Sequence, residues 1–78
     1  MVLEEIKHII SDLLNVDEDR LSEETDIQNE LSADSLDLYE ILMSAEDTFN
    51  VKVEAEDVEE IHTIGDAVRI IEKYMDRD

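Results

Sequence analysis

The sequence predicts an all-α protein: a small four-helix bundle, with three longer helices, one short helix and a long loop between the first two. Two observations favour this fold class. Apolar residues recur mostly at intervals of three and four, the spacing of one helix face. In addition, no convincing second strand exists to pair with the one segment that alternates like a strand. A chain of this length forms one modest core, so we expect a single domain over residues 1–78.

The first helix is predicted over residues 2–15, where seven apolar side chains repeat at helical spacing. They are Val2, Leu3, Ile6, Ile9, Ile10, Leu13 and Leu14. The pattern lapses between residues 16 and 33, a polar and acidic stretch. Its isolated apolar residues are Leu21, Ile27 and Leu31. We therefore expect a long loop that these three side chains pin to the core.

The second helix is predicted to start near Ser35, because Asp34 precedes a long periodic run and its carboxylate can accept a backbone N–H bond. At 100° per residue, the core-facing side chains are Leu38, Ile41, Leu42, Ala45 and Phe49. The other side carries a shorter apolar strip of Leu36, Tyr39 and Met43. Acids flank this strip at Asp37, Glu40, Glu46 and Asp47.

The remaining chain predicts a short third helix and a longer fourth one. Residues 51–54 alternate like a strand, but an isolated strand is not stable, so we expect an extended loop. A short helix follows over about residues 55–61. Thr63 and Asp66 have the spacing of a capping box, which places the start of the last helix near residue 64 and its end near residue 75.

The charge of the chain restricts its partners. Twenty-four acidic residues oppose six Lys and Arg, which gives a formal net charge of −18. Such a surface repels nucleic acid and anionic lipid, so we expect basic protein partners. Acids at positions 4 and 5 argue against a signal peptide, and no apolar run approaches the ~20 residues of a membrane span. We expect a cytoplasmic monomer that does not insert into membranes.

Ser35 stands between two carboxylates at a predicted helix start, where a serine most often forms part of the cap. A nucleophilic serine needs an adjacent base, and the only histidines are His8 and His62. We therefore expect no catalytic residue and no enzyme; if Ser35 is functional, another protein acts on it. The histidines lack metal-ligand spacing and the acidic clusters lack the order of an EF-hand loop, so no metal site is expected.

The stretch Glu30-Leu31-Ser32-Ala33-Asp34-Ser35-Leu36-Asp37 resembles the phosphopantetheine attachment motif of acyl carrier proteins, whose core is Asp-Ser-Leu. The resemblance continues through residues 40–49 and covers nearly the whole chain. It implies that a phosphopantetheinyl transferase attaches 4′-phosphopantetheine from coenzyme A to Ser35, with Asp34 and Leu36 beside the cofactor. The terminal thiol of this arm would then carry acyl groups as thioesters.

The resemblance also implies a surface for partner enzymes and a space for the cargo. The acids Asp34, Asp37, Glu40, Glu46 and Asp47 would face basic docking patches of acyl-transferring and fatty acid synthesis enzymes. Leu36 and Met43 would fill small apolar pockets. Steering by charge and holding by apolar contact are general features of interfaces. The acyl chain would enter an apolar space lined by Leu38, Leu42, Ala45, Phe49, Val58, Ile61, Ala67 and Ile71.

Two residues depart from the family pattern. Ser32 stands where the family usually has glycine, which would strain the backbone if φ is positive there. Tyr39 is a large aromatic residue where a smaller one is expected. The leading hypothesis is a carrier of discrete-enzyme, type II fatty acid synthesis. Alternatives are a carrier for polyketide, aminoacyl or D-alanyl transfer and, from another class, an acidic nucleic-acid mimic or cation buffer that does not need Ser35.

Overall fold

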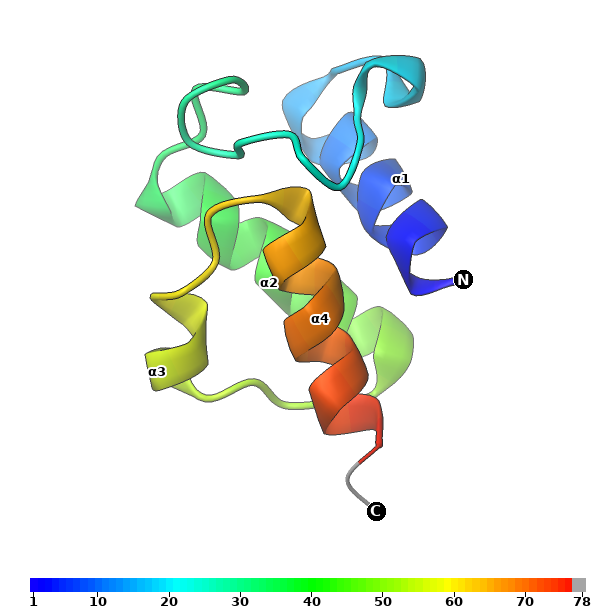
Figure 1. Cartoon of the computed structure of the whole chain (residues 1–78), viewed down its shortest axis with the longest axis vertical. Coiled ribbons are helices and arrows are strands. Elements are labelled where there is room, and N and C mark those ends of the chain that lie inside the picture. Colours follow the sequence, from blue (N-terminus) through cyan, green and yellow to red (C-terminus); the bar gives the residue numbers. More distant parts are fainter. Residues whose placement is uncertain (77–78) are drawn as a thin grey trace.

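The computed structural model describes residues 1–76, which form four α-helices and one 3-10 helix (Figure 1). Their bounds are α1 Val2–Leu14, η1 Glu18–Arg20, α2 Ser35–Phe49, α3 Ala55–Val58 and α4 Ile64–Met75. The all-α prediction of three longer helices and a short one is confirmed. Two details differ: η1 lies inside the predicted loop, and α3 ends at Val58 because the chain turns at residues 59–60.

The three long helices pack against one another in every pairing, and α3 lies to one side of them (Figure 1). One apolar core runs between them, centred on six isoleucines that are almost fully buried: Ile6, Ile10, Ile27, Ile61, Ile64 and Ile71. Four of the five core positions predicted on α2 are buried. The fifth, Phe49, is only partly buried at the end of the helix.

The residues that flank the helices are suited to capping them. Asn15 and Asn50 follow α1 and α2 with φ of 59° and 56°, in the left-handed conformation that asparagine tolerates better than most residues. Thr63 and Asp66 form the predicted capping box of α4. This chain uses asparagine where helices more often end on glycine.

The loop before α2 is held to the core as predicted, since Leu21 and Ile27 are buried and Leu31 is partly buried, and backbone bonds also join it to the start of α4. The Ile27 N–H donates to the His62 carbonyl at 2.9 Å, and the Ile64 N–H donates to the Thr25 carbonyl at 3.0 Å. The Gly65 N–H donates to the Glu23 carbonyl at 2.8 Å. The loop carbonyls thus satisfy N–H groups in the first turn of α4, which have no partner within their own helix.

The short helix α3 is tied to the last turns of α4. The Tyr74 hydroxyl donates to the Asp57 carboxylate and accepts a bond from the Glu54 N–H at 3.3 Å. The Lys73 Nζ lies 3.3 Å from the same Asp57 carboxylate. Within residues 1–76, no helix has the length and apolar character needed to cross a membrane.

Candidate functional site

Ser35 is the first residue of α2, and its side chain is exposed. The preceding turn is fixed by a reciprocal capping box: Asp34 Oδ1 accepts the Asp37 N–H at 2.9 Å, and Asp37 Oδ2 accepts the Asp34 N–H at 3.3 Å. The sequence predicted the cap at Asp34 but not the return bond from Asp37. The two carboxylates therefore hold Ser35 at the positive end of a 15-residue helix.

A groove of about 380 Å³ opens beside Ser35. Its apolar lining comes from α2, α3 and the turn after α3: Leu38, Ala55, Val58 and Ile61. Its polar lining is Gln28 from the loop, Tyr39 from α2 and Glu59 after α3. A flexible, amphipathic group attached to the Ser35 hydroxyl would find both apolar surface and hydrogen-bonding groups here.

The interior lies directly beneath this groove. Leu38 and Ile61 line the groove and also a fully apolar internal void of about 10 Å³ between α1, α2 and α4. That volume is at the lower limit for a single water molecule. The interior is therefore closed in this structure, and an acyl chain can enter only if the helices move apart.

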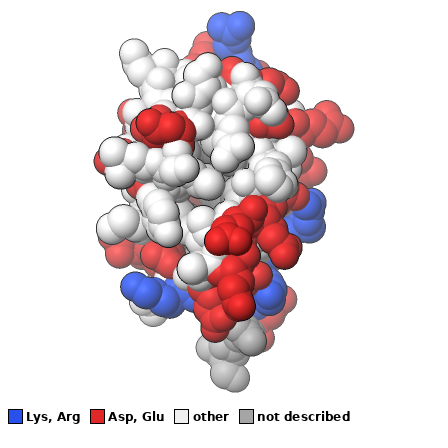
Figure 2. Space-filling model, turned by 90° about the vertical axis from the view of Figure 1, so that its left-hand side faces the viewer, with Lys and Arg blue, Asp and Glu red and all other residues white. Residues whose placement is uncertain are grey.

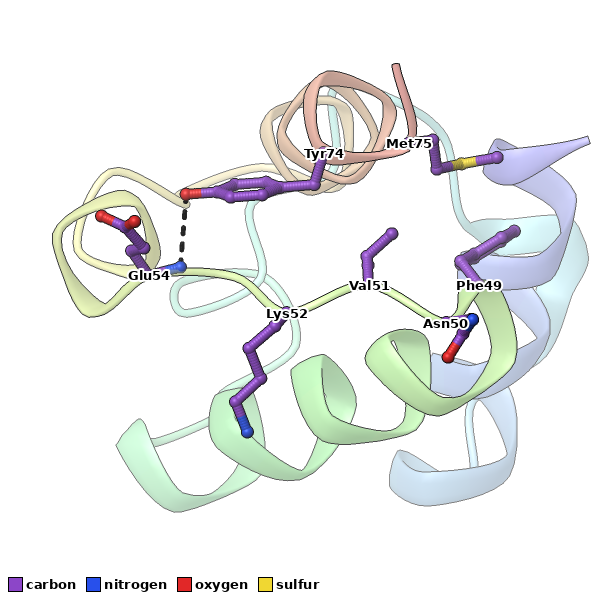
Figure 3. Close-up of a pocket in the computed structure, with 7 residues that line it drawn as sticks. All are labelled: Phe49, Asn50, Val51, Lys52, Glu54, Tyr74 and Met75. Atoms are coloured by element: carbon purple, nitrogen blue, oxygen red, sulfur yellow. Dashed lines mark hydrogen bonds between the residues drawn. The ribbon is translucent and has the colours of Figure 1, made fainter. Parts of the chain in front are cut away.

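A second and larger groove, of about 670 Å³, lies at the other end of α2 (Figure 3). Phe49 and Met75 line it, and the Tyr74 ring extends across it to the Glu54 N–H. Fifteen residues of α-helix span roughly 20 Å, so this groove is remote from Ser35. Phe49, expected beside the cargo, faces this remote groove because it ends α2.

The predicted docking strip is exposed along α2. Leu36, Tyr39 and Met43 are 67%, 51% and 60% exposed, respectively. The acids Asp34, Glu40 and Asp47 are exposed, and Asp37 is half-buried in the capping box. Glu46 differs from the others, because its carboxylate accepts the Val53 N–H at 2.7 Å and holds the loop after α2.

The face that contains α3 and the start of α2 is mostly uncharged at its centre (Figure 2). Acidic side chains border this area and gather toward the lower right of the view. An uncharged centre inside a charged rim is the usual anatomy of a protein interface. Asp34 and Asp37 beside Ser35 and Glu59 in the groove supply negative charge at the edge of this uncharged area.

The structure adds two groove residues that the sequence did not indicate, Gln28 and Glu59. Gln28 is brought there by a tight turn in which the Asp26 carboxylate accepts the Asn29 N–H at 2.8 Å and its side-chain amide at 3.0 Å. The Asn29 bonds hold the pKa of Asp26 below its usual value. Glu59 lies far along the chain from Ser35, and Gln28 reaches the groove through the fold of the loop, so no periodic pattern connects either residue to Ser35.

Comparisons with known proteins agree with this arrangement. The family described as "Phosphopantetheine attachment site" matches residues 4–71. An acyl carrier protein of Thermotoga maritima is 46% identical over 74 residues, which cover 95% of this chain and 91% of that protein. The solved structure of an acyl carrier protein from Enterococcus faecalis superposes with a TM-score of 0.79 at 33% identity, covering 94% of this chain and 92% of that one.

The chain therefore belongs to the acyl carrier protein family, whose members carry a covalently attached 4′-phosphopantetheine prosthetic group. The residues present fit such a group. Ser35 offers an exposed hydroxyl, a helix N-terminus favours an attached phosphate, and the adjoining groove can receive the arm. When bound, this group supplies the thiol that forms thioesters, while the protein supplies position and shelter.

Proposed function

We propose that this protein carries acyl intermediates in type II fatty acid synthesis on a phosphopantetheine arm attached to Ser35, and that residues 1–78 form one carrier domain. The observation that carries the proposal is the exposed Ser35 hydroxyl beside a groove that shares Leu38 and Ile61 with the apolar interior. The Asp-Ser-Leu sequence at the head of α2 supports the same residue.

The attachment step makes one bond and breaks one. The Ser35 Oγ forms a bond to the phosphorus next to the pantetheine moiety of coenzyme A, and the pyrophosphate bond breaks. Adenosine 3′,5′-bisphosphate leaves, and the serine proton passes to a base of the transferase. No histidine lines the groove beside Ser35 in the described residues, so the base comes from the partner. The carrier itself catalyses no reaction.

The partner enzymes are proposed to dock on the exposed strip of α2. Basic patches would pair with Asp34, Asp37, Glu40 and Asp47, while Leu36 and Met43 would occupy apolar pockets on the enzyme. Rim charges chiefly set the association rate, whereas buried apolar contacts set the lifetime of the complex. Glu46 would contribute less, because the Val53 N–H already occupies one of its oxygens. The cytoplasmic location expected from the sequence stays part of this proposal.

Intact mass spectrometry tests the attachment site. The protein is incubated with coenzyme A and a promiscuous phosphopantetheinyl transferase, alongside Ser35→Ala and the control Ser44→Ala, which removes another serine of α2. We expect the parent chain and Ser44→Ala to gain one phosphopantetheine and Ser35→Ala to gain none. No gain by a folded, unmodified parent chain would leave Ser35 as a helix-cap residue and favour the acidic mimic or buffer.

The mass of the native cargo tests the pathway. Tyr39 and Ser32 depart from the family pattern and favour a specialised carrier as the second candidate. Protein isolated from its own cells should carry straight-chain acyl groups that differ by two carbons if it serves fatty acid synthesis. An aminoacyl, D-alanyl or polyketide mass instead would leave Ser35 in its role and reassign the pathway.

A further inference from the structure

Tyr39 divides the cleft between α2 and the segment around α3 into two grooves. The first is the groove beside Ser35. The second, of about 260 Å³, contains Met43 and Val53. Tyr39, Ala55 and Val58 line both grooves, so the two meet where these side chains stand.

The helix geometry places Tyr39 between Ser35, which lines the first groove, and Met43, which lines the second. Ser35, Tyr39 and Met43 are spaced by four residues, so they form one row along α2. At 1.5 Å per residue, the row from Ser35 to Met43 is roughly 12 Å long. An extended phosphopantetheine arm is longer than this, so it could reach the second groove if nothing stood in its path.

The two grooves offer an acyl group different destinations. Leu38 and Ile61 form the floor of the first groove and also line the internal void. The second groove shares only Leu42 with that void, and it runs past Met43, which is 60% exposed, and the exposed Lys52. An acyl group in the first groove faces the interior, whereas one in the second groove would remain partly in water.

We propose that the Tyr39 ring directs the acyl group of the loaded arm past Leu38 and Ile61 toward the interior and keeps it out of the surface groove beside Met43. This inference rests on the proposed attachment of the arm to Ser35. The obstacle is the aromatic ring itself, a large planar side chain that lines both grooves while it stays 51% exposed. The hydroxyl is not required.

Methyl NMR of the loaded protein tests the proposal. The parent chain, Tyr39→Ala and Tyr39→Phe are each loaded with octanoyl-phosphopantetheine from octanoyl-coenzyme A, and their methyl shifts are compared with those of the unacylated forms. In the parent chain and Tyr39→Phe, we expect shifts at Leu38 and Ile61 and none at Met43 and Val53. In Tyr39→Ala, shifts should appear at Met43 and Val53.

A chemical measurement supplies an independent readout. Cleavage of the thioester by hydroxylamine should be several-fold faster in Tyr39→Ala than in the parent chain or Tyr39→Phe, because the acyl group spends more time at the surface. Tyr39→Val serves the same purpose if the alanine variant does not fold, which circular dichroism reports. Equal cleavage rates in all folded variants would contradict the proposed role of the ring.

The outcomes separate this inference from the function on which it rests. If intact mass shows no loading at Ser35, the proposed function fails and the inference fails with it. If loading is normal but Met43 and Val53 already shift in the parent chain, or do not shift in the alanine variant, the Tyr39 proposal alone is wrong.

Discussion

Ser32, three residues before Ser35, has a strained backbone conformation. Its φ of 56° lies in the left-handed region, as do those of Asn15 and Asn50. For a residue with a Cβ this conformation costs roughly 1–2 kcal/mol, although asparagine adopts it more readily than serine. The strain that the sequence suggested at Ser32 is therefore present in the loop that leads into α2.

Replacing Ser32 by glycine should stabilise the protein. Glycine relieves the left-handed strain but adds roughly 0.4–1 kcal/mol of unfolded-state entropy, so we expect a net gain of about 0.5 kcal/mol in the free energy of unfolding. Urea unfolding monitored by circular dichroism measures it. Asn50→Gly, at the same φ, is the control and should gain less; a loss of stability in Ser32→Gly would show that the serine side chain stabilises the loop.

The residues at the helix starts were also predicted well from the sequence. Asp34, Ser35 and the Thr63–Asp66 pair were placed correctly because caps depend on neighbours a few positions away. Gln28 and Glu59 could not be placed at the groove, because their approach to Ser35 depends on how the loop and α3 fold back. The sequence suggested that Glu46 is a free surface acid. Its bond to the Val53 N–H could not be predicted, because that bond depends on the path of the chain after α2.

At the scale of the elements, the contact between the loop and α4 leaves little room for a side chain at Gly65. A Cβ added there would lie 3.0 Å from the Glu23 carbonyl oxygen, which accepts the N–H of the same glycine. The obstacle is backbone, so the loop itself would have to shift. The first turn of α4 can approach the loop this closely because residue 65 is glycine.

Gly65→Ala should therefore destabilise the protein although alanine favours helices. We expect the strained contact to outweigh the helical gain of up to about 1 kcal/mol and to leave a net loss of about 1 kcal/mol. Thermal unfolding measures the loss, and hydrogen exchange should show faster exchange at Ile27 and Ile64. The control Ser44→Ala makes a change to alanine within α2; a more stable Gly65→Ala would mean that the loop shifts freely.

A second link between elements depends on pH. His8 on α1 has Nδ1 3.1 Å from Glu18 of η1 and Nε2 3.4 Å from Asp12. The hydrogen bond to Glu18 and the charge of Asp12 raise the pKa of His8 above 6.5. The stabilisation from protonated His8 is therefore complete below pH 6.5 and is lost as pH rises through the raised folded-state pKa.

His8→Gln should lower the melting temperature at acidic pH and have little effect at alkaline pH. The measurement is a series of thermal melts from about pH 5.5 to about pH 8.5, where histidine changes charge. His62→Gln, which removes the other histidine, is the control. A difference between His8→Gln and the parent chain that stays constant across the series would assign His8 a role independent of its charge.

The elements show what periodicity can and cannot predict. The long helices α1 and α4 were identified to within about one residue at each end, and α2 at its start, because each buries a regular apolar face. The 3-10 helix η1 was missed, since three residues held by an Asp17 cap have no periodic signal. The end of α3 was predicted too late in the chain, near residue 61. Ile61 is buried, but it follows the turn at residues 59–60 and is not part of a helix.

For the molecule as a whole, the net charge of −18 acts against compactness. The described residues form few ion pairs, and in the pairs of Arg69 with Asp66 and Lys73 with Asp57 the basic side chains are 70% and 53% exposed. Exposed pairs add little stability, and like charges repel across the small domain. Salt screens such interactions over about 10 Å at 0.1 M.

The melting temperature should therefore rise with ionic strength. Between roughly 0.01 M and 0.5 M NaCl we expect an increase of about 5 °C or more, equivalent to about 1 kcal/mol for a domain of this size. The double variant Glu60→Gln/Glu72→Gln removes two negative charges. It should have a higher melting temperature at low salt and a smaller increase of that temperature with added salt. Identical melting temperatures at low salt, high salt and millimolar Mg²⁺ would contradict the repulsion.

The closed interior of the carrier sets a threshold on chain length. Parting Leu38 from Ile61 to enlarge a void of about 10 Å³ has a roughly fixed cost, whereas each buried methylene returns about 0.8 kcal/mol. Short acyl groups cannot recover that cost and would stay within reach of any docking enzyme. Longer ones would be retained inside, so the rate at which the carrier delivers its cargo should fall as the cargo grows.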